Sequence, residues 1–348
     1  MTDVSTAMER RIKTLQKNCK SIRNNLNSKS ISGFKILEVL KVDQYRFCKV
    51  PKCGCTYWLQ VFLVMKKTIK PEVLSNLDRE ELHFRLQDSI ISYDYIPEVT
   101  DLMIMITRDP WKRLYSAYID KIYRGQSNFL SLHKEMTSCS GTSECYTIPT
   151  FQEFLDYIVR ISAEGRELDM HWQPVSDMCK VCSNKYRYIV KQEAFVKESA
   201  YILENILQQS PDIKDTLISL LTEKFAKNSL LQLGRQFVSE MSASHCQNFK
   251  DKIKRLWVSF QNQGLISDKI KFDIGLFENL SEQNGTEILN IFMTRGTSLE
   301  LSNNERTLQR HKHLVNAYKN IRRKTLVNIQ DVYYNDFLLF EYKKTPPS

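Results

Sequence analysis

The sequence predicts an α/β fold with a central parallel sheet, and three segments carry this prediction. Residues 45–50 have the character of a short strand, residues 57–65 form an apolar helix-like run, and residues 102–107 form a continuous apolar run. Such a continuous run is typical of a strand buried on both faces of a parallel sheet. Strand, helix and strand in this order form a βαβ unit, which binds ligands beyond the carboxyl ends of its strands. Residues 186–190 are expected to form a third strand, and residues 194–207 an amphipathic helix.

The loop between the first strand and the first helix has the composition of an anion-binding element. After Pro51 it reads Lys-Cys-Gly-Cys-Thr. The first amides of a helix have no partner within the helix and point toward the preceding loop, where they suit an anion. Gly54 allows close approach of the backbone, Thr56 offers a hydroxyl, and Lys52 adds a mobile cation. An oxyanion group is therefore the expected ligand.

The strand over residues 102–107 leads into a second candidate anion-binding element. Arg108 follows the strand directly, Pro110 is well placed to start a helix, and Ser116 lies on that helix. The Arg108 guanidinium as a bidentate partner and the Ser116 hydroxyl as a neutral hydrogen-bond donor suit a second phosphate. The alternative is that Arg108 only pairs with a surface acid.

Length and composition predict a folded, enzyme-like body. The chain has 348 residues, of which 42% are hydrophobic. We expect a polar, basic N-terminal arm over residues 1–35 and a single domain over 36–348, in which 209–300 is a divergent insertion without a sharp motif. The formal net charge of +10 favours an anionic ligand such as a nucleotide, a sulfated or carboxylated glycan, or nucleic acid. A basic surface kept for solubility is the alternative.

Nine cysteines are many for a cytosolic protein of this size. Cys139 and Cys145 flank a polar loop that a disulfide would close. Cys179 and Cys182 form a CxxC pair, but no second pair stands at zinc-finger spacing, so we expect no zinc ribbon.

The sequence carries conflicting indications of location. Two glycosylation sequons begin at Asn279 and Asn284 and fit a lumenal setting. No stretch approaches 18 uninterrupted apolar residues, and the N-terminus lacks a signal-peptide core, so the chain as given reads as soluble.

Five features in the same order resemble Golgi carbohydrate sulfotransferases, closest to the branch that sulfates chondroitin, dermatan and related glycans. PKCGCTYW (51–58) and RDPWKRLYSAY (108–118) resemble the two cofactor-binding motifs of that family. The others are a His-Trp-x-Pro segment with a CxxC (171–182), an Ile-x-Lys-x-Glu-like strand end (189–193) and an Asp-Phe-x-Leu-Phe-x-Tyr helix (336–342).

The resemblance implies a P-loop-like three-layer α/β sandwich with a helical C-terminal part, which binds 3′-phosphoadenylyl sulfate (PAPS). Carried over residue by residue, Arg108 and Ser116 hold the 3′-phosphate. The 5′-phosphosulfate loop consists of Lys52, Cys53, Gly54, Cys55, Thr56, Tyr57 and Trp58. The loop is a variant, because Tyr57 stands where many relatives have Asn and Cys53 where they often have a small aliphatic residue.

The expected reaction moves a sulfuryl group from PAPS to a hydroxyl of a glycosaminoglycan or an N-acetylgalactosamine-containing chain. Lys52 would neutralise charge on the departing phosphate. The loop lacks the Gly-Lys-Ser/Thr ending of a nucleoside-triphosphate enzyme, which favours metal-free transfer of sulfate over phosphate transfer. His171 is the first choice for the general base, with His83 and Glu81 as alternatives. His171 is equally compatible with a hydrogen-bonded core position beside Trp172.

The competing prediction is a non-catalytic, sulfotransferase-like protein that binds nucleotide or glycan. The expected partner is an anionic or amino-sugar glycan, with no nucleic acid. By family resemblance the location is the lumenal side of the Golgi membrane. The family also implies a membrane anchor, for which the sequence as given has no apolar run. A truncated gene model, a processed form or a real loss would explain this. We favour a truncated start and expect an upstream extension of the reading frame to encode an apolar run of about 20 residues.

Overall fold

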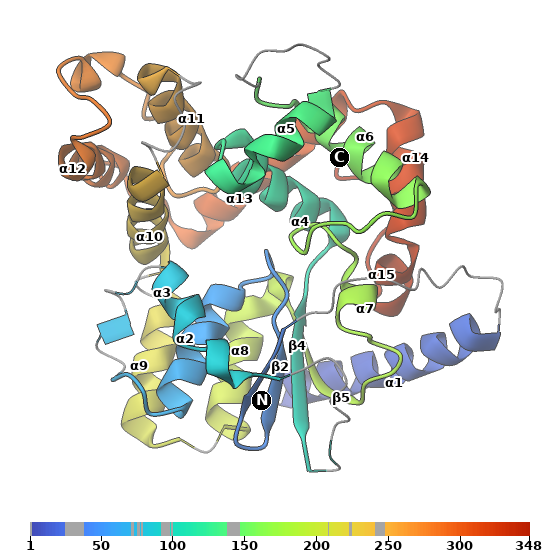
Figure 1. Ribbon diagram of the computed structural model, residues 1–348. Coiled ribbons are helices and arrows are strands. Elements are labelled where there is room, and N and C mark those ends of the chain that lie inside the picture. Colours follow the sequence, from blue (N-terminus) through green and yellow to red (C-terminus); the bar gives the residue numbers. More distant parts are fainter. Residues whose placement is uncertain are drawn as a thin grey trace. The chain divides into compact units, whose positions relative to one another are not determined.

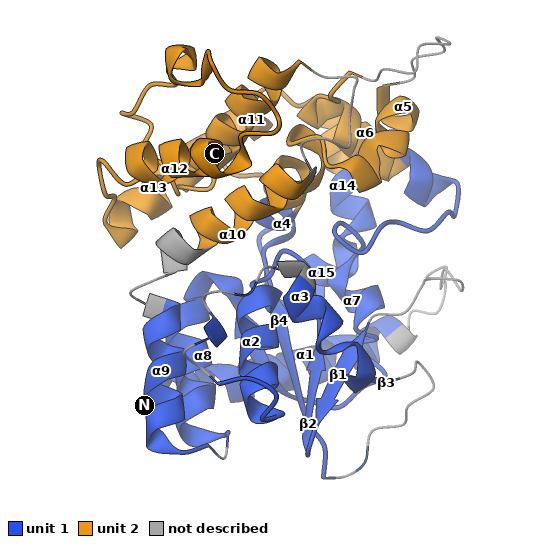
Figure 2. Cartoon of the chain, turned by 60° about the vertical axis from the view of Figure 1, so that its left-hand side comes forward, with its two compact units in different colours: residues 1–113, 160–223, 328–345 blue, residues 114–159, 224–327, 346–348 orange. Residues whose placement is uncertain are grey.

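The computed structural model describes residues 2–24, 38–70, 73–74, 77, 79–91, 98, 100–137, 147–207, 209–222, 225–240 and 248–348 (Figure 1). These residues fall into two compact units (Figure 2). The first consists of residues 1–113, 160–223 and 328–345, and the second of residues 114–159, 224–327 and 346–348.

The first unit is built on a five-stranded sheet with the strand order β3-β1-β2-β4-β5. Its strands are β1 (Val39–Val42), β2 (Tyr45–Cys48), β3 (Ile90–Ile91), β4 (Leu102–Thr107) and β5 (Tyr186–Lys191). β2, β4 and β5 pair in parallel, whereas β1 pairs antiparallel with both β2 and β3. The predicted parallel sheet is therefore confirmed for β2, β4 and β5, and the antiparallel strands β1 and β3 were not predicted.

The inner strands β2 and β4 are almost completely buried, and the one charged residue of β2, Arg46, forms an ion pair of 2.6 Å with Asp101. All four residues of β2 are buried, as are the last five of β4. Helix α2 (Cys55–Met65), which follows β2, buries nearly every side chain. Together β2, α2 and β4 are the predicted βαβ unit, and the loop before α2 and the residues after β4 lie at the carboxyl ends of their strands.

The remaining elements of the first unit are helices. They are α1 (Thr2–Asn24), α3 (Arg79–Phe84), η2 (Gln87–Ser89), α7 (Val175–Met178), η5 (Gln192–Ala194), α8 (Phe195–Asn205), α9 (Pro211–Thr222) and α15 (Tyr334–Leu339). Three further helices run from one unit into the other: α4 (Pro110–Ala117), α6 (Phe151–Ala163) and α14 (Arg323–Val332).

Helix α1 packs against β5 and α15, which differs from the expected solvated arm over the described residues 2–24. Its buried side chains recur at helical spacing: Val4, Met8, Leu15 and Cys19. The Arg11 guanidinium forms an ion pair of 2.6 Å with Glu198 on α8 and donates to the Ile189 carbonyl at 2.9 Å. The narrow apolar face of α1 was not predicted, because Lys and Arg dominate the composition of this segment.

Each cysteine of the CxxC pair forms a disulfide with a different part of the first unit. Cys179 bonds Cys48 at the end of β2, and Cys182 bonds Cys19 on α1. The pair therefore serves as two structural cross-links. The predicted bridge between residues 139 and 145 lies outside the described residues. Among the described residues, no group of three or more His, Cys, Asp and Glu side chains is arranged to hold a metal ion.

The second unit is helical. It contains η3 (Tyr118–Tyr123, a π-helix), η4 (Ser127–Phe129), α5 (Leu130–Thr137), α10 (Phe225–Glu240), α11 (Phe249–Asn262), η7 (Ile274–Phe277), α12 (Gly285–Gly296) and α13 (Asn303–Lys319). Its core is a separate apolar cluster around Trp257, Phe260, Phe277 and Phe292. The expected helical C-terminal part consists of α13, α14 and α15.

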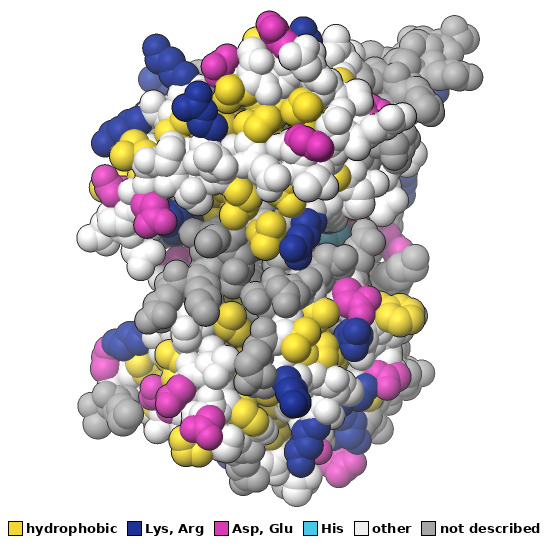
Figure 3. Space-filling view, turned by 90° about the vertical axis from the view of Figure 1, so that its left-hand side faces the viewer, with side chains coloured by type: hydrophobic (Ala, Val, Ile, Leu, Met, Phe, Trp, Pro, Cys, Tyr) yellow, Lys and Arg dark blue, Asp and Glu magenta, His cyan; other side chains and the backbone are white. Residues whose placement is uncertain are grey.

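The described surface and helices add two observations about charge and hydropathy. On the face drawn in Figure 3, Lys and Arg side chains lie interspersed with Asp and Glu side chains. The net positive charge is therefore not gathered into one basic patch on that face. Within the described part of the chain, no helix has both the length and the apolar character needed to span a membrane.

Candidate active site

The loop between β2 and α2 has two residues with positive φ, Gly54 and Lys52. Gly54 has φ of 94° and precedes α2 without a side-chain cap. A Cβ placed on Gly54 would lie 2.8 Å from the Phe195 ring, so a side chain there would meet both strain and a clash. Lys52 also has a positive φ, 68°, which a residue with a side chain rarely adopts. The loop is thus a tight cradle in front of helix amides that the N-cap residue, a glycine, cannot satisfy, which suits an anion.

The other loop residues divide between the cradle and the core. Thr56 is half-buried at the start of α2. Cys53 and Cys55 are buried free thiols, and burial raises the pKa of Cys53 to about 12, so this thiol is neutral. Tyr57 and Trp58 are core residues: the Tyr57 hydroxyl donates to a carbonyl of α9 at 3.0 Å, and the Trp58 ring is fully buried. Any part that these two take in binding would go through their backbone amides.

Arg108 connects the tip of β4 to the cradle. Its Nη1 donates to the Lys52 carbonyl at 2.8 Å, which helps to hold Lys52 in its unusual conformation. Its Nε is buried, and no described residue accepts a hydrogen bond from it. Burial lowers the pKa of Arg108, and the charge of the Glu193 carboxylate acts in the opposite direction. A guanidinium stays charged in such a setting, so the unused Nε donor fits an anionic ligand.

Arg113 is a structural residue of the site that the sequence did not reveal. It is 1% exposed and lies on α4. Its Nε donates to the Pro51 carbonyl at 3.1 Å, at the start of the loop. Nη1 and Nη2 donate to the carbonyls of Gln173 (2.5 Å) and Met170 (2.8 Å). One buried guanidinium therefore joins the loop to the turn that contains His171, and its only signal in the sequence was membership of the RDPWKRLYSAY motif.

His171 forms a local pair with Asp169. The Asp169 Oδ1 accepts from the His171 backbone amide at 2.8 Å and lies 2.7 Å from the ring Nδ1. A carboxylate at Nδ1 favours the tautomer with the proton on that nitrogen, so Nε2 carries the basic lone pair. The His171 side chain is 19% exposed. This partly open position differs from that of a fully buried core histidine.

The C-terminal helix α15 supports the same turn. Asp336 is buried and accepts from the backbone amides of Val175 (2.8 Å) and Ser176 (2.7 Å), at the start of α7. The Tyr333 hydroxyl donates to the Trp172 carbonyl. Residues far apart in the sequence thus fix the backbone that follows His171.

Three predicted residues remain: Ser116, Glu81 and His83. Ser116 lies on α4 in the second unit, so its partnership with Arg108 stays a prediction. Glu81 and His83 lie on α3, and the Glu81 carboxylate accepts from Arg85 at 2.5 Å. The structure therefore brings together Lys52, Arg108 and, through Arg113, the turn of His171.

Comparison with known proteins indicates the same family as the sequence motifs. The profile of the sulfotransferase family matches residues 39–257. Mouse carbohydrate sulfotransferase 14 is 29% identical over 178 residues, which cover 48% of this chain and 46% of that protein. Human carbohydrate sulfotransferase 9 is 24% identical over 261 residues, covering 70% and 57%, respectively. Mouse carbohydrate sulfotransferase 11 is 25% identical over 174 residues, covering 45% and 49%.

The chain spans about half the length of the curated relatives that it matches. No solved structure matches it significantly. The family profile covers more than half of the chain, including β1, β2, β4 and β5 and both candidate anion-binding elements. The chain belongs to the sulfotransferase family.

Proposed function

We propose that this protein transfers a sulfuryl group from PAPS to a hydroxyl of a glycan. The observation that carries the proposal is the cradle at Gly54, with uncapped helix amides and the unused Nε of Arg108 beside it. The names of the relatives, carbohydrate sulfotransferases 14, 9 and 11, support a carbohydrate acceptor. The first unit would then correspond to a P-loop-like, three-layer sulfotransferase core.

The two anion-binding elements would bind the two ends of the sulfuryl donor. In this proposal the amides at the start of α2, the Thr56 hydroxyl and the Lys52 ammonium hold the 5′-phosphosulfate. Arg108 holds the 3′-phosphate, with Ser116 as its predicted partner. PAPS supplies an activated S–O bond, and Lys52 would stabilise the charge that collects on the departing phosphate.

Nucleotide binding is the first test of this function. The purified protein is expected to bind adenosine 3′,5′-bisphosphate in buffer that contains a chelator, because the proposed contacts use amides, hydroxyls and cations of the protein. Isothermal titration calorimetry measures the affinity, and a sulfate-incorporation screen over chondroitin, dermatan, heparan and N-acetylgalactosamine-terminated acceptors measures turnover. Binding that depends on added Mg²⁺ would contradict the proposal. Binding without turnover on any glycan would favour a non-catalytic role.

The Asp169–His171 pair would act as the general base toward the acceptor hydroxyl. Asp169 fixes the ring and stabilises the imidazolium that forms when Nε2 takes the proton. His171→Ala is expected to lower kcat by about 100-fold or more while the affinity for the nucleotide stays unchanged, because general-base catalysis contributes 10²–10⁴-fold. Steady-state kinetics and calorimetry separate the two effects.

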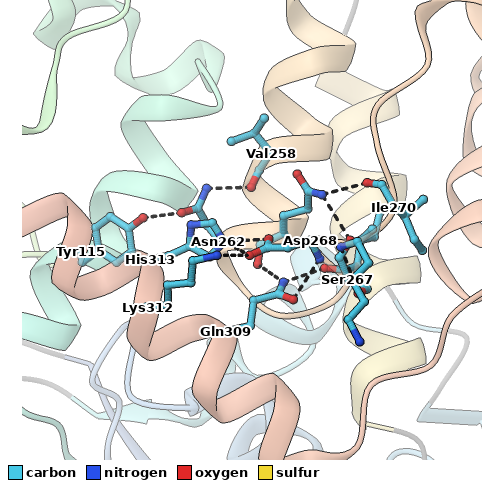
Figure 4. A network of polar contacts seen from close by, with 12 residues as sticks. Tyr115, Val258, Asn262, Ser267, Asp268, Ile270, Gln309, Lys312 and His313 are labelled. Atoms are coloured by element: carbon cyan, nitrogen blue, oxygen red, sulfur yellow. Dashed lines mark hydrogen bonds and ion pairs between the residues drawn. The ribbon is translucent and has the colours of Figure 1, made fainter.

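The second unit offers a matched control for this variant. His313 on α13 is also paired with an aspartate, since its Nε2 lies 2.8 and 3.0 Å from the two carboxylate oxygens of Asp268 (Figure 4). In that network Asp268 also contacts Lys312, and its backbone amide donates to Gln309. His313→Ala removes the same kind of pair and should leave kcat unchanged. An equal loss in both variants would mean that His171 acts through stability alone.

The Golgi lumen is the location that we propose for this activity. Two disulfides in the first unit suit an oxidising compartment. Asn279, which begins the first sequon, is exposed and thus compatible with glycosylation there.

A further inference from the structure

Two sequence features that the proposed function does not use meet close to Arg108. One is the end of β5 with Lys191 and Glu193, and the other is Tyr342 near the C-terminus. The Tyr342 hydroxyl donates to Glu193 Oε2 at 3.1 Å. The Lys191 ammonium lies 4.3 Å from the centroid of the Tyr342 ring, within the range of a cation–π contact. This hydrogen bond therefore attaches the C-terminal segment to the residues that follow β5, although the two residues are 149 positions apart in the sequence.

The second oxygen of the Glu193 carboxylate faces the start of α4. Oε1 accepts from the Asp109 backbone amide at 3.3 Å and lies 3.5 Å from the Lys112 ammonium. Asp109 in turn caps the helix, because its Oδ1 accepts from the Trp111 amide at 2.9 Å. Glu193 thus connects the C-terminal segment with the residues that directly follow Arg108.

Glu193 also acts on Arg108 through its charge. Burial lowers the pKa of Arg108, and the carboxylate of Glu193 raises it, so the two groups lie within electrostatic reach. Burial and the charge of Glu193 both raise the pKa of Tyr342 well above 10, which keeps this phenol protonated as a hydrogen-bond donor.

A bare carboxylate at this place would oppose the binding of a phosphate. Like charges a few ångströms apart repel each other strongly where water is partly excluded. The Tyr342 hydroxyl and the Lys112 ammonium lie on the two oxygens of Glu193 and reduce its negative potential. The Glu193 side chain can therefore bind the start of α4 without cancelling the positive potential of Arg108.

We propose that Glu193 and Tyr342 are positioning residues that set the affinity for the 3′-phosphate of the sulfuryl donor. They hold Arg108 and the first turn of α4 at the end of β4 and do not contact the sulfuryl group. The inference rests on the proposed function, because it concerns the same donor site, and it gives a role to two motifs that the reaction itself leaves unassigned.

The test compares two nucleotides that differ only in the 3′-phosphate. Calorimetry with adenosine 3′,5′-bisphosphate and with adenosine 5′-monophosphate is carried out on the full chain and on Tyr342→Phe, Glu193→Ala and Glu193→Gln. Tyr342→Phe is expected to weaken the bisphosphate by about tenfold, the effect of one hydrogen bond to a charged group, and to leave the monophosphate unchanged. Glu193→Ala should weaken binding of the bisphosphate at least as much as Tyr342→Phe does. Glu193→Gln keeps an oxygen acceptor and should retain most of the affinity of the unaltered protein.

A second tyrosine in the same segment provides the control. Tyr334 is 46% exposed and carries the Lys344 ammonium 4.0 Å from its ring centroid, so it repeats the Lys–Tyr contact away from Glu193. Tyr334→Phe should change neither affinity. Equal weakening of both nucleotides in Tyr342→Phe, or tighter bisphosphate binding in Glu193→Ala, would overturn the inference. If the unaltered protein binds neither nucleotide, the proposed function itself is refuted.

Discussion

Lys52→Ala is expected to lower kcat by about 100- to 1,000-fold, the loss that follows removal of one group that stabilises transition-state charge. Arg108 donates a hydrogen bond to the Lys52 carbonyl, so the Lys52 side chain starts from a fixed backbone position in the loop that precedes α2. The nucleotide affinity should fall less than kcat, because charge on the departing phosphate grows only during transfer. Sulfate incorporation at saturating PAPS, together with calorimetry on the bisphosphate, measures the two effects.

The opposite end of α2 supplies the control for Lys52→Ala. Lys67 also has a positive φ, 57°, and is exposed. Lys67→Ala removes the same charge from the same type of backbone position. Its turnover should equal that of the unaltered protein. A loss of less than tenfold in Lys52→Ala would rule out Lys52 as the main stabilising cation.

Arg113→Ala is expected to lower the free energy of unfolding by about 3 to 5 kcal/mol, because it leaves two buried carbonyls and one partly buried carbonyl without their charged donor. Arg113 bonds one carbonyl of the phosphosulfate loop and two in the turn of His171, so activity should fall together with stability. Arg113→Lys should recover only a small part, since an ammonium cannot reproduce the planar fork of a guanidinium. Denaturant unfolding of both variants measures the change.

An exposed arginine of the same unit shows what a simple loss of charge does. Arg187 lies exposed on β5, and its replacement by alanine should change the free energy of unfolding by less than about 0.5 kcal/mol. If Arg113→Ala were no more destabilising than Arg187→Ala, the connection between the loop and the His171 turn would not depend on Arg113.

The central part of the fold was predictable because its signals are local and strong. β2, α2, β4 and β5 combine apolar runs with clear breaks, and the structure has them within a few residues of the predicted ranges. β1 and β3 were missed because strands of four and two residues carry little pattern of their own and exist through pairing with their neighbours. The buried face of α1 was missed because polar residues outnumber its apolar ones.

The candidate site shows the same division between local and long-range information. The cradle at Gly54 and the pairing of His171 with Asp169 depend on residues a few positions apart, and the cradle could be predicted from them. The contacts of Arg113 and the meeting of Glu193 with Tyr342 join segments about 60 and 149 positions apart, which periodicity does not encode. Disulfide connectivity likewise cannot be deduced from the positions of the cysteines.

The bridge between Cys19 and Cys182 has a consequence for the integrity of the protein. It attaches α1 to the residues that follow α7 by a bond that does not involve the peptide chain between α1 and β1. A single proteolytic cut between residues 19 and 38 would therefore leave α1 covalently attached and in register on β5. The N-terminal helix can be lost only after both the peptide chain and this bridge are broken, so a reducing environment decides whether such a cut matters.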